Sequence, residues 1–336
     1  MKFSTKLKAL ALGTAALAMT ALAGCGGQQS ASSGSGSGAK TYHIGIVQLV
    51  EHNALDAANK GFVDGLAERG YKEGENVEFD RQNAQADQSN LQNIAQRFVN
   101  NKVDLICAIA TPAAQTIANA THDIPIVGTA ITDYVGAKLA ASNDKPGANI
   151  TGTSDMNPIK EQVDLLMKVV PNAKTVGVIY CSSEVNSEVQ VKAMQEYAES
   201  KGLTVKVATI STVNDIQQAA QSLVNDVDVF YVPTDNVIAS AMPNLCAITD
   251  AAHKAVICGE PNMVKAGGLI TYGIDYYSLG LQTGRMAADI LEGKAKPADM
   301  PIQMAKELKV TVNKKDATTL GITIPDDLLK DADVVE

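Results

Sequence analysis

The chain of 336 residues has no tryptophan and only 5 phenylalanines and 9 tyrosines. A folded core must therefore come mainly from alanine, valine, leucine and isoleucine, in a sequence that is 46% hydrophobic and long enough for about two domains. Basic residues are also scarce, because 28 Lys and Arg against 37 Asp and Glu leave a net charge of −9. Without a long basic run the chain is a poor candidate for nucleic-acid binding, which needs cations to neutralise phosphates.

Motifs of catalytic and cofactor sites are missing as well. The loop after the first predicted strand, residues 48–53, reads QLVEHN and lacks the Gly-x-Gly-x-x-Gly pattern of a dinucleotide site. Neither a Walker lysine loop nor a Gly-x-Ser-x-Gly elbow occurs. The 4 histidines and 5 cysteines do not show the spacing of metal ligands. We therefore expect a protein without a cofactor or metal that is not an enzyme.

The N-terminus has the pattern of an export signal. Residues 1–24 carry three lysines and no acid, so the rest of the chain holds a net charge of −12. The apolar stretch at 9–22 is too short for a membrane span and is typical of a signal peptide. It ends in Leu-Ala-Gly before Cys25, which resembles the lipobox of bacterial lipoproteins. We predict a lipoprotein signal peptide at 1–24, lipidation of Cys25 and a Gly/Ser tether at 25–40, and hence an extracytoplasmic, lipid-anchored protein. An ordinary cleaved signal peptide is the alternative.

From residue 41 onward, short apolar runs alternate with amphipathic ones, and the pattern occurs twice. This alternation predicts βαβ units and parallel sheets covered on both faces. In the first half we expect strands at 43–50, 76–81, 103–110 and 124–129, and helices at 55–69, 88–100 and 112–120. In the second half we expect strands at 175–180, 204–209, 227–232 and 255–258, and helices at 187–201, 215–225 and 238–252.

The two halves also resemble each other directly. Residues 98–112 and 223–234 both run through Val-Asn and Val-Asp into an apolar strand and a Thr/Pro turn. A further helix at 278–291 and a late strand at 308–312 predict that the chain crosses between the halves more than once. We therefore predict an α/β fold of two doubly wound, Rossmann-like lobes joined by a multi-strand hinge. Lobe 1 would comprise 41–153 plus 274–302, and lobe 2 would comprise 154–273 plus 303–330.

Ligands of open α/β sheets bind beyond the carboxyl ends of the strands, and the polar residues at these positions are the candidate site. They are Gln48, His52, Asn53, Thr111, Thr132, Asp133, Ser154, Asp155, Asn186, Thr234, Asp235, Asn236, Asp275 and Tyr276. Any one of them could instead be an ordinary helix N-cap, which contributes about 1 kcal/mol to stability. Their convergence on one cleft is what favours a binding site.

The residue types suggest the ligand's polar groups. Thr111 and Ser154 are candidates for holding a carboxylate, and Asp133, Asp235 and Asp275 are candidates for holding an ammonium group. Together they match the zwitterion of an amino acid. Side chains that could line a pocket for the rest of the ligand are His52, Tyr134 and Tyr276.

Seven segments carry a resemblance to a known family: 48–56 (QLVEHNALD), 83–85 (NAQ), 129–133 (TAITD), 149–158 (NITGTSDMNP), 183–187 (SEVNS), 231–236 (YVPTDN) and 273–276 (GIDY). The chain after residue 40 resembles the substrate-binding lipoproteins of ABC transporters, in the type I periplasmic-binding-protein class and its branch for tryptophan/tyrosine-type uptake. The resemblance implies a monomer whose lobes close on a small solute and deliver it to a membrane permease. It also implies an aromatic amino acid, such as tryptophan, tyrosine or phenylalanine, as the solute.

Other functions remain open at this point. The same fold could serve as a ligand-sensing module for a receptor, or bind another amino acid, a nucleoside or a sugar. The missing tryptophan mildly disfavours sugars, whose rings commonly stack on Trp or Phe. A surface enzyme would need a reactive group of residues, and the sequence shows none.

Overall fold

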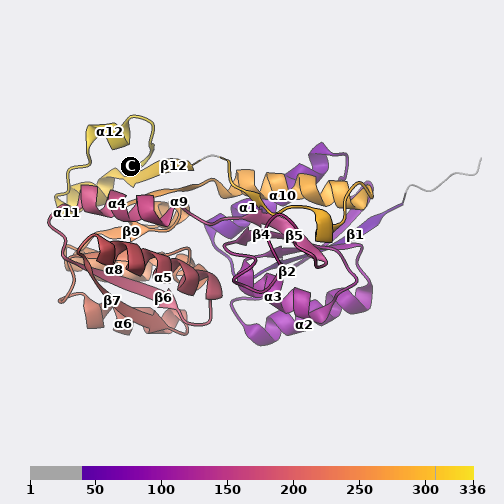
Figure 1. The fold of residues 1–336 in the computed structure, drawn as a ribbon, viewed down its shortest axis with the longest axis horizontal. Coiled ribbons are helices and arrows are strands. Elements are labelled where there is room, and N and C mark those ends of the chain that lie inside the picture. Colours follow the sequence, from indigo (N-terminus) through magenta and orange to yellow (C-terminus); the bar gives the residue numbers. More distant parts are fainter. Residues whose placement is uncertain (1–39, 307) are drawn as a thin grey trace, which may run out of the picture. The chain divides into compact units, whose positions relative to one another are not determined.

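The computed structural model describes residues 40–306 and 308–336, which form one compact unit. The predicted signal peptide, the lipidation of Cys25 and all of the tether except Lys40 lie outside the described residues. Two sheets, each covered by helices on both faces, make up the two lobes of this unit (Figure 1). We call the part built on the six-stranded sheet lobe 1 and the part built on the seven-stranded sheet lobe 2.

The sheet of lobe 1 has the strand order β11-β5-β4-β3-β1-β2, and all its strand pairs are parallel. Its central strands β3 and β4 are buried throughout, because helices cover both of their faces. The strands are β1 (Tyr42–Gln48), β2 (Val77–Asn83), β3 (Leu105–Ile109), β4 (Ile126–Ile131), β5 (Ile150–Ser154) and β11 (Gln303–Met304). The helices are α1 (Asn53–Glu68), α2 (Gln88–Asn101), α3 (Thr111–Ala120) and α10 (Tyr276–Leu291). Helices α1 and α10 lie together on one face of the sheet, and α2 and α3 lie on the other (Figure 1).

The sheet of lobe 2 has the order β13-β12-β10-β9-β8-β6-β7, and only the β10–β12 pair is antiparallel. Its strands are β6 (Thr175–Cys181), β7 (Thr204–Ile210), β8 (Val229–Val232), β9 (Val256–Cys258), β10 (Ile270–Ile274), β12 (Leu308–Asn313) and β13 (Asp333–Val335). Its helices are α4 (Ile159–Val169), α5 (Val185–Ser200), α6 (Ile216–Leu223), α7 (Asn236–Ser240), α8 (Met242–Ala251), α9 (Pro261–Lys265), α11 (Lys314–Leu320) and α12 (Asp326–Leu329). Apolar side chains fill both faces of this sheet as separate clusters.

The chain passes between the lobes three times: after β5, between β10 and α10, and between β11 and β12. The second passage is the shortest, because only Asp275 separates the last residue of β10 from the first residue of α10. These three passages are the structural counterpart of the predicted hinge.

Several local expectations need correction. Strand β5 and helix α4 precede the point at which we expected the second half to begin. The expected helix at 238–252 is two helices, which break at Ala241 ahead of Pro243. Gln303–Met304 pairs with β5 and so belongs to the sheet of lobe 1, whereas we had assigned residue 303 onward to lobe 2. The sheet of lobe 2 also extends beyond residue 330, because β13 pairs with β12.

Helix α10 is held against α1 by unusually close backbone contact. A Cβ atom added at Gly280 would lie 2.0 Å from the Ala58 carbonyl oxygen, and one at Gly284 would lie 2.2 Å from the Phe62 carbonyl oxygen. Only glycine permits this approach. Because α10 begins directly after the second passage, its contact with α1 anchors one end of the hinge in lobe 1.

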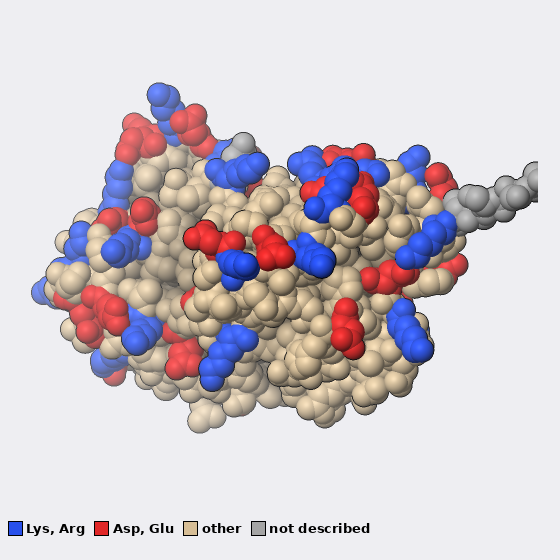
Figure 2. Space-filling view, turned by 45° about the vertical axis from the view of Figure 1, so that its right-hand side comes forward, with Lys and Arg blue, Asp and Glu red and all other residues tan. Residues whose placement is uncertain are grey.

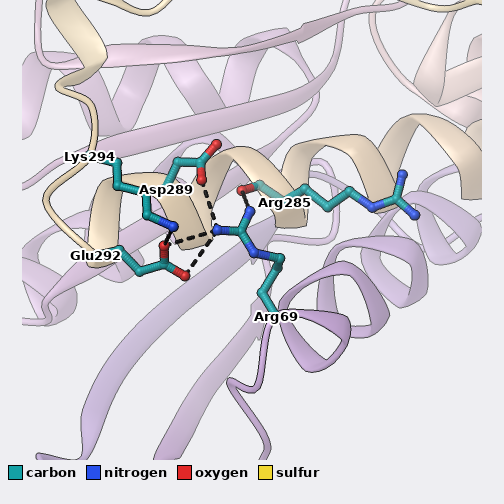
Figure 3. A network of polar contacts seen from close by, with 5 residues as sticks. All are labelled: Arg69, Arg285, Asp289, Glu292 and Lys294. Atoms are coloured by element: carbon teal, nitrogen blue, oxygen red, sulfur yellow. Dashed lines mark hydrogen bonds and ion pairs between the residues drawn. The ribbon is translucent and has the colours of Figure 1, made fainter.

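Ion pairs join the carboxyl ends of the same two helices (Figure 3). Arg69 Nη2 lies 2.9 Å from both Asp289 Oδ1 and Glu292 Oε2, and Lys294 pairs with Glu292. These groups are partly exposed, so each pair contributes little by itself. On the face shown in Figure 2, acidic and basic side chains are interspersed rather than gathered into a basic stripe.

Three further properties concern the described residues alone. No helix within 40–306 and 308–336 is long and apolar enough to cross a membrane. Cys107, Cys181, Cys246 and Cys258 are buried free thiols. In this part of the chain, no group of three or more His, Cys, Asp and Glu side chains is arranged to hold a metal ion.

Candidate functional site

A cavity lies between the lobes, at the carboxyl ends of the strands. It is lined by His52, Ala54, Leu55, Ala130, Thr132, Asp155, Asn186, Thr234, Asp235, Asn236, Ala239, Glu260, Met263 and Tyr276. Only about 10 Å³ of it is open to a water-sized solute, far below the volume of about 300–1,000 Å³ that ligand sites usually offer, so the surrounding groups must shift to admit a ligand. Three lining residues are carboxylic acids and none is lysine or arginine. The site therefore favours a small ligand that carries a positive charge.

Sheet topology explains why these segments meet. In lobe 1, β1 pairs with both β2 and β3, so the loop from β1 to α1 lies where the strand order reverses. In lobe 2, β6 lies in the same way between β7 and β8. Loops at such a reversal leave in opposite directions and open a crevice. The two crevices face each other across the cavity, with His52 from lobe 1 and Asn186 and Asn236 from lobe 2.

Asp155 is a buried carboxylate in the first passage between the lobes, and it is only 3% exposed. Its Oδ1 accepts a hydrogen bond from Thr132 Oγ1, and its Oδ2 accepts one from the Tyr276 hydroxyl, both at 2.8 Å. Burial raises the pKa of the Asp155 carboxyl above its usual range, and the two hydroxyl donors offset part of this effect. Each oxygen keeps a free acceptor position, and no lysine or arginine among the described residues pairs with Asp155.

Asp235 and Glu260 are also buried carboxylates, but backbone N–H groups already occupy them. Asp235 caps α7 through Ile238 N and also accepts from Cys181 N and Ser187 Oγ. Glu260 caps α9 through Asn262 N at 2.6 Å and Met263 N at 2.8 Å. Burial raises the pKa of Glu260 to about 7 and also raises that of Asp235. These two acids form part of the lobe 2 wall of the cavity, but backbone N–H groups already use most of their acceptor positions.

A chain of hydrogen bonds runs from lobe 2 to lobe 1 through Asn236. The buried Glu184 accepts from the N–H groups of Asn236 and Val237 and, at 2.5 Å, from Asn236 Nδ2. Asn236 Oδ1 lies 3.3 Å from His52 Nε2, across the cavity edge. Burial, followed by the nearby Asp235, raises the pKa of Glu184. Burial also lowers the pKa of His52 to about 4, so its imidazole is neutral.

Two polar atoms of the lining residues have no hydrogen-bond partner in the part of the chain that the structure describes. They are His52 Nδ1 and Asn186 Oδ1, and both are buried. The amide nitrogen of Asn186 donates to Glu184 and to the Thr234 carbonyl, so its oxygen is left as an acceptor. Because buried polar groups normally have partners, these two atoms mark positions for donors on a ligand.

The structure brings most of the predicted site residues together and leaves the others outside the cavity. Those that line it are His52, Thr132, Asp155, Asn186, Thr234, Asp235, Asn236 and Tyr276. Those that do not line it are Gln48, Asn53, Thr111, Asp133, Ser154 and Asp275. The expectation that all of them face one cleft is therefore corrected for the second group.

Local hydrogen bonds explain most of the outside positions. Asp275 is exposed and caps α10 through Ser278 N, and Asp133 turns to the N–H groups of Val135 and Gly136. Gln48 donates to Asp56 Oδ1 and to the Val50 carbonyl. Ser154 Oγ donates to the Thr132 carbonyl. Asn53 is exposed as the first residue of α1.

Two other predictions also need comment. Thr111 begins α3 with its Oγ1 buried and unpartnered, but it is not among the lining residues. Tyr134, expected as a pocket wall, is buried in lobe 1, where its hydroxyl donates to the Gly128 carbonyl. Glu184 and Glu260 also follow strands, and the strand-end rule reaches both, but neither was among the candidate ligand contacts. The apolar lining residues, such as Leu55 and Met263, carry no such signal.

A polar cavity between two lobes that are joined by three chain passages is typical of a binding protein that closes on a small ligand. The chain belongs to the family of ABC transporter substrate binding proteins, whose pattern matches residues 43–336. The resemblance inferred from the sequence is thereby confirmed, as is the two-lobed α/β fold with parallel sheets. This is a family of substrate-binding proteins rather than enzymes.

Individual relatives are similar over most of the chain. The tyrosine-binding protein of Clostridioides difficile (strain R20291) is 43% identical over 302 residues, which cover 89% of this chain and 87% of that protein. An ABC domain from Streptococcus pneumonia, solved in complex with L-Trp, is 43% identical with a TM-score of 0.85, and the match covers 88% of this chain and 100% of that one.

A third relative bears on the arrangement of the lobes. It is a substrate-binding protein with adhesive properties from Clostridium difficile in its ligand-free, open structure, 44% identical over 88% of this chain and 99% of that one. Its TM-score is only 0.68, although its identity of 44% is close to the 43% of the L-Trp complex. Together with the contact between His52 and Asn236, this difference indicates that the structure described here is closed.

Proposed function

We propose that this protein is the extracytoplasmic solute-binding component of an ABC importer and that its solute is an aromatic amino acid, such as tyrosine, tryptophan or phenylalanine. The observation that carries the proposal is the cavity between the lobes, which is lined by acids without a balancing lysine or arginine. The relatives named for tyrosine binding and solved with L-Trp support the choice of solute.

Asp155 is our candidate for the residue that binds the solute's ammonium group. It is the carboxylate in the cavity with the fewest donors, and both of its donors are hydroxyls. A buried carboxylate without a cation is unfavourable, and an ammonium group would relieve that cost. The other proposed ligand contacts are the remaining predicted residues that line the cavity, together with Glu260.

The mechanism that we propose is a population shift. A solute that touches both lobes stabilises the closed form, which the permease then recognises. We also propose that the protein acts as a monomer and is anchored to the cell membrane through Cys25. An anchored binding protein would stay near its permease while the tether leaves the lobes free to bind.

Calorimetry of the purified full chain against amino acids, nucleosides and sugars tests the choice of solute. We expect binding of an aromatic L-amino acid with one solute per chain. Heat with a sugar or nucleoside and none with any amino acid would refute it. Because the chain contains no tryptophan, fluorescence excited at the red edge of indole absorption would report bound tryptophan directly.

A further inference from the structure

The feature that the proposed function leaves unexplained is the second nitrogen of His52. The orientation of the Asn236 amide decides which atom it offers to the histidine. Its Nδ2 donates to Glu184, whose carboxylate is held in place by the N–H groups of Asn236 and Val237. Both Glu184 oxygens thus accept from backbone N–H groups, and Oε2 also accepts from the amide nitrogen of Asn236. Asn236 therefore presents its oxygen, and not its nitrogen, to His52.

This orientation fixes the tautomer of the histidine. His52 Nε2 must donate to Asn236 Oδ1, which lies 3.3 Å away. A neutral imidazole has a single N–H, so Nδ1 carries a lone pair and acts only as an acceptor. Burial keeps the ring neutral, because it lowers the pKa of His52 to about 4. Nδ1 is buried and has no partner in the protein, although His52 lines the cavity.

The surroundings of His52 suggest which part of the ligand meets it. Ala54 and Leu55 follow it in the chain and line the same cavity, and Ala239 lies one helical turn after Asn236. This part of the wall suits an aromatic ring rather than a charged group. An ammonium group is better matched by Asp155, which is ionisable and has free acceptor positions.

We propose that His52 Nδ1 accepts a hydrogen bond from the side chain of the ligand, and that Asn236 is the positioning residue that orients it. The proposal rests on the proposed function and narrows it: the site would select aromatic amino acids with a side-chain donor, an indole N–H or a phenol O–H, over phenylalanine. A site that buries an acceptor rejects an analogue without the donor, because the acceptor is then left unpaired.

Matched ligands test this without any change to the protein. L-Tryptophan is compared with benzothienylalanine, in which sulfur replaces the indole N–H, and L-tyrosine with para-fluorophenylalanine. Calorimetry on the full chain should show at least one donor-bearing ligand binding about tenfold or more tightly than its partner. Equal affinities within both pairs would overturn the inference while leaving the proposed function intact. Failure of every aromatic amino acid to bind would instead refute the proposed function.

Variants then assign the selectivity to His52. His52→Leu should reduce the ratio of affinities within the selective pair to near one, with little change for the ligand that lacks the donor. Asn236→Ala should reduce the same ratio, and it serves as the second variant if His52→Leu does not fold. Asn53→Ala, at an exposed neighbour outside the cavity, is the control and should keep the ratio. A ratio that survives in both site variants, or an equal loss of affinity for both ligands, would overturn the assignment.

Discussion

The carboxylate of Asp155 provides the sharpest test of the proposed site, because its replacement should affect stability and binding in opposite ways. Asp155→Asn keeps the shape of the side chain and removes its charge. Its two partners, Thr132 Oγ1 and the Tyr276 hydroxyl, can each either donate or accept, so both hydrogen bonds at 2.8 Å can be kept. The variant therefore isolates the charge from the packing.

The expected effect on stability follows from burial. Asp155 is 3% exposed and has no cation beside it among the described residues. Burial therefore disfavours its ionised form in the folded protein and raises its pKa. Removing the charge should leave the free energy of unfolding of the ligand-free protein unchanged or make it larger. The wild-type protein should also gain stability as the pH falls through the pKa of Asp155, and the variant should lose this contribution.

The expected effect on binding is a large loss. Leaving a buried ammonium group without its charged partner costs about 2–5 kcal/mol, which corresponds to roughly 30-fold to several thousandfold weaker affinity. Calorimetry with the preferred amino acid measures the affinity, and urea unfolding without ligand measures the stability. Asp275→Asn is the matched control, because it removes an exposed charge that caps a helix outside the cavity.

Two results would contradict this reasoning. If Asp155→Asn binds amino acids as tightly as the wild-type protein, the ammonium group is not held by Asp155. If the variant is much less stable without ligand, the weaker binding reflects damaged folding rather than a missing charge.

Three further predictions concern the packing of α10, the cap at Asp275 and the pH dependence of binding. Gly284→Ala should lower the free energy of unfolding, measured by urea titration, by about 3 kcal/mol or more, because the new Cβ would lie 2.2 Å from a backbone oxygen of α1. Gly293→Ala is the control: this glycine has φ +71° and open space around it, so the same titration should show a loss of only about 1 kcal/mol. Asp275→Ala should cost about 1 kcal/mol of stability through the lost cap and leave the affinity measured by calorimetry unchanged; a large loss of affinity would return Asp275 to the site. The pKa of His52 is about 4 in the closed form and should approach 6.5 once opening exposes the ring, so protonation favours the open form and affinity should fall as the pH drops from about 6.5 towards 4. Buried carboxylates with raised pKa values change the affinity in the opposite direction as the pH falls. The affinity is therefore measured against pH for both the wild-type protein and His52→Gln, and the two profiles are compared. Identical profiles would argue against this role of His52.

The fold was predictable because its elements are encoded locally. The apolar strand Leu105–Ile109 and the amphipathic face of Gln88–Asn101 can be recognised from their periodicity, and the repeated pattern indicates two lobes. The short strand Gln303–Met304 was assigned to the wrong lobe, because its partner β5 lies about 150 residues away in the chain. A two-residue strand has no periodicity of its own, and only the pairing places it.

The site was predictable only in part, because residues of the same type at the same kind of position have different roles. Asp155 and Asp275 both lie in passages between the lobes. Asp155 faces the cavity, whereas Asp275 turns away to cap α10. The preference of aspartate for both roles makes the two indistinguishable in the sequence. The cavity position of Asp155 depends on the hydroxyls of Thr132 and Tyr276, which come from distant segments.

The amino-acid sequence by itself determined the class of this protein: two α/β lobes, polar strand ends and the motif segments that carry the family resemblance. The tertiary structure decided which of those polar residues meet, and in which state. Sheet order brought His52 against Asn236 across the lobes, Glu184 set the orientation of that amide, and burial set the charge of the ring. Strand and helix patterns depend on neighbours a few residues apart, whereas a hydrogen-bond acceptor and its ionisation depend on everything packed around it.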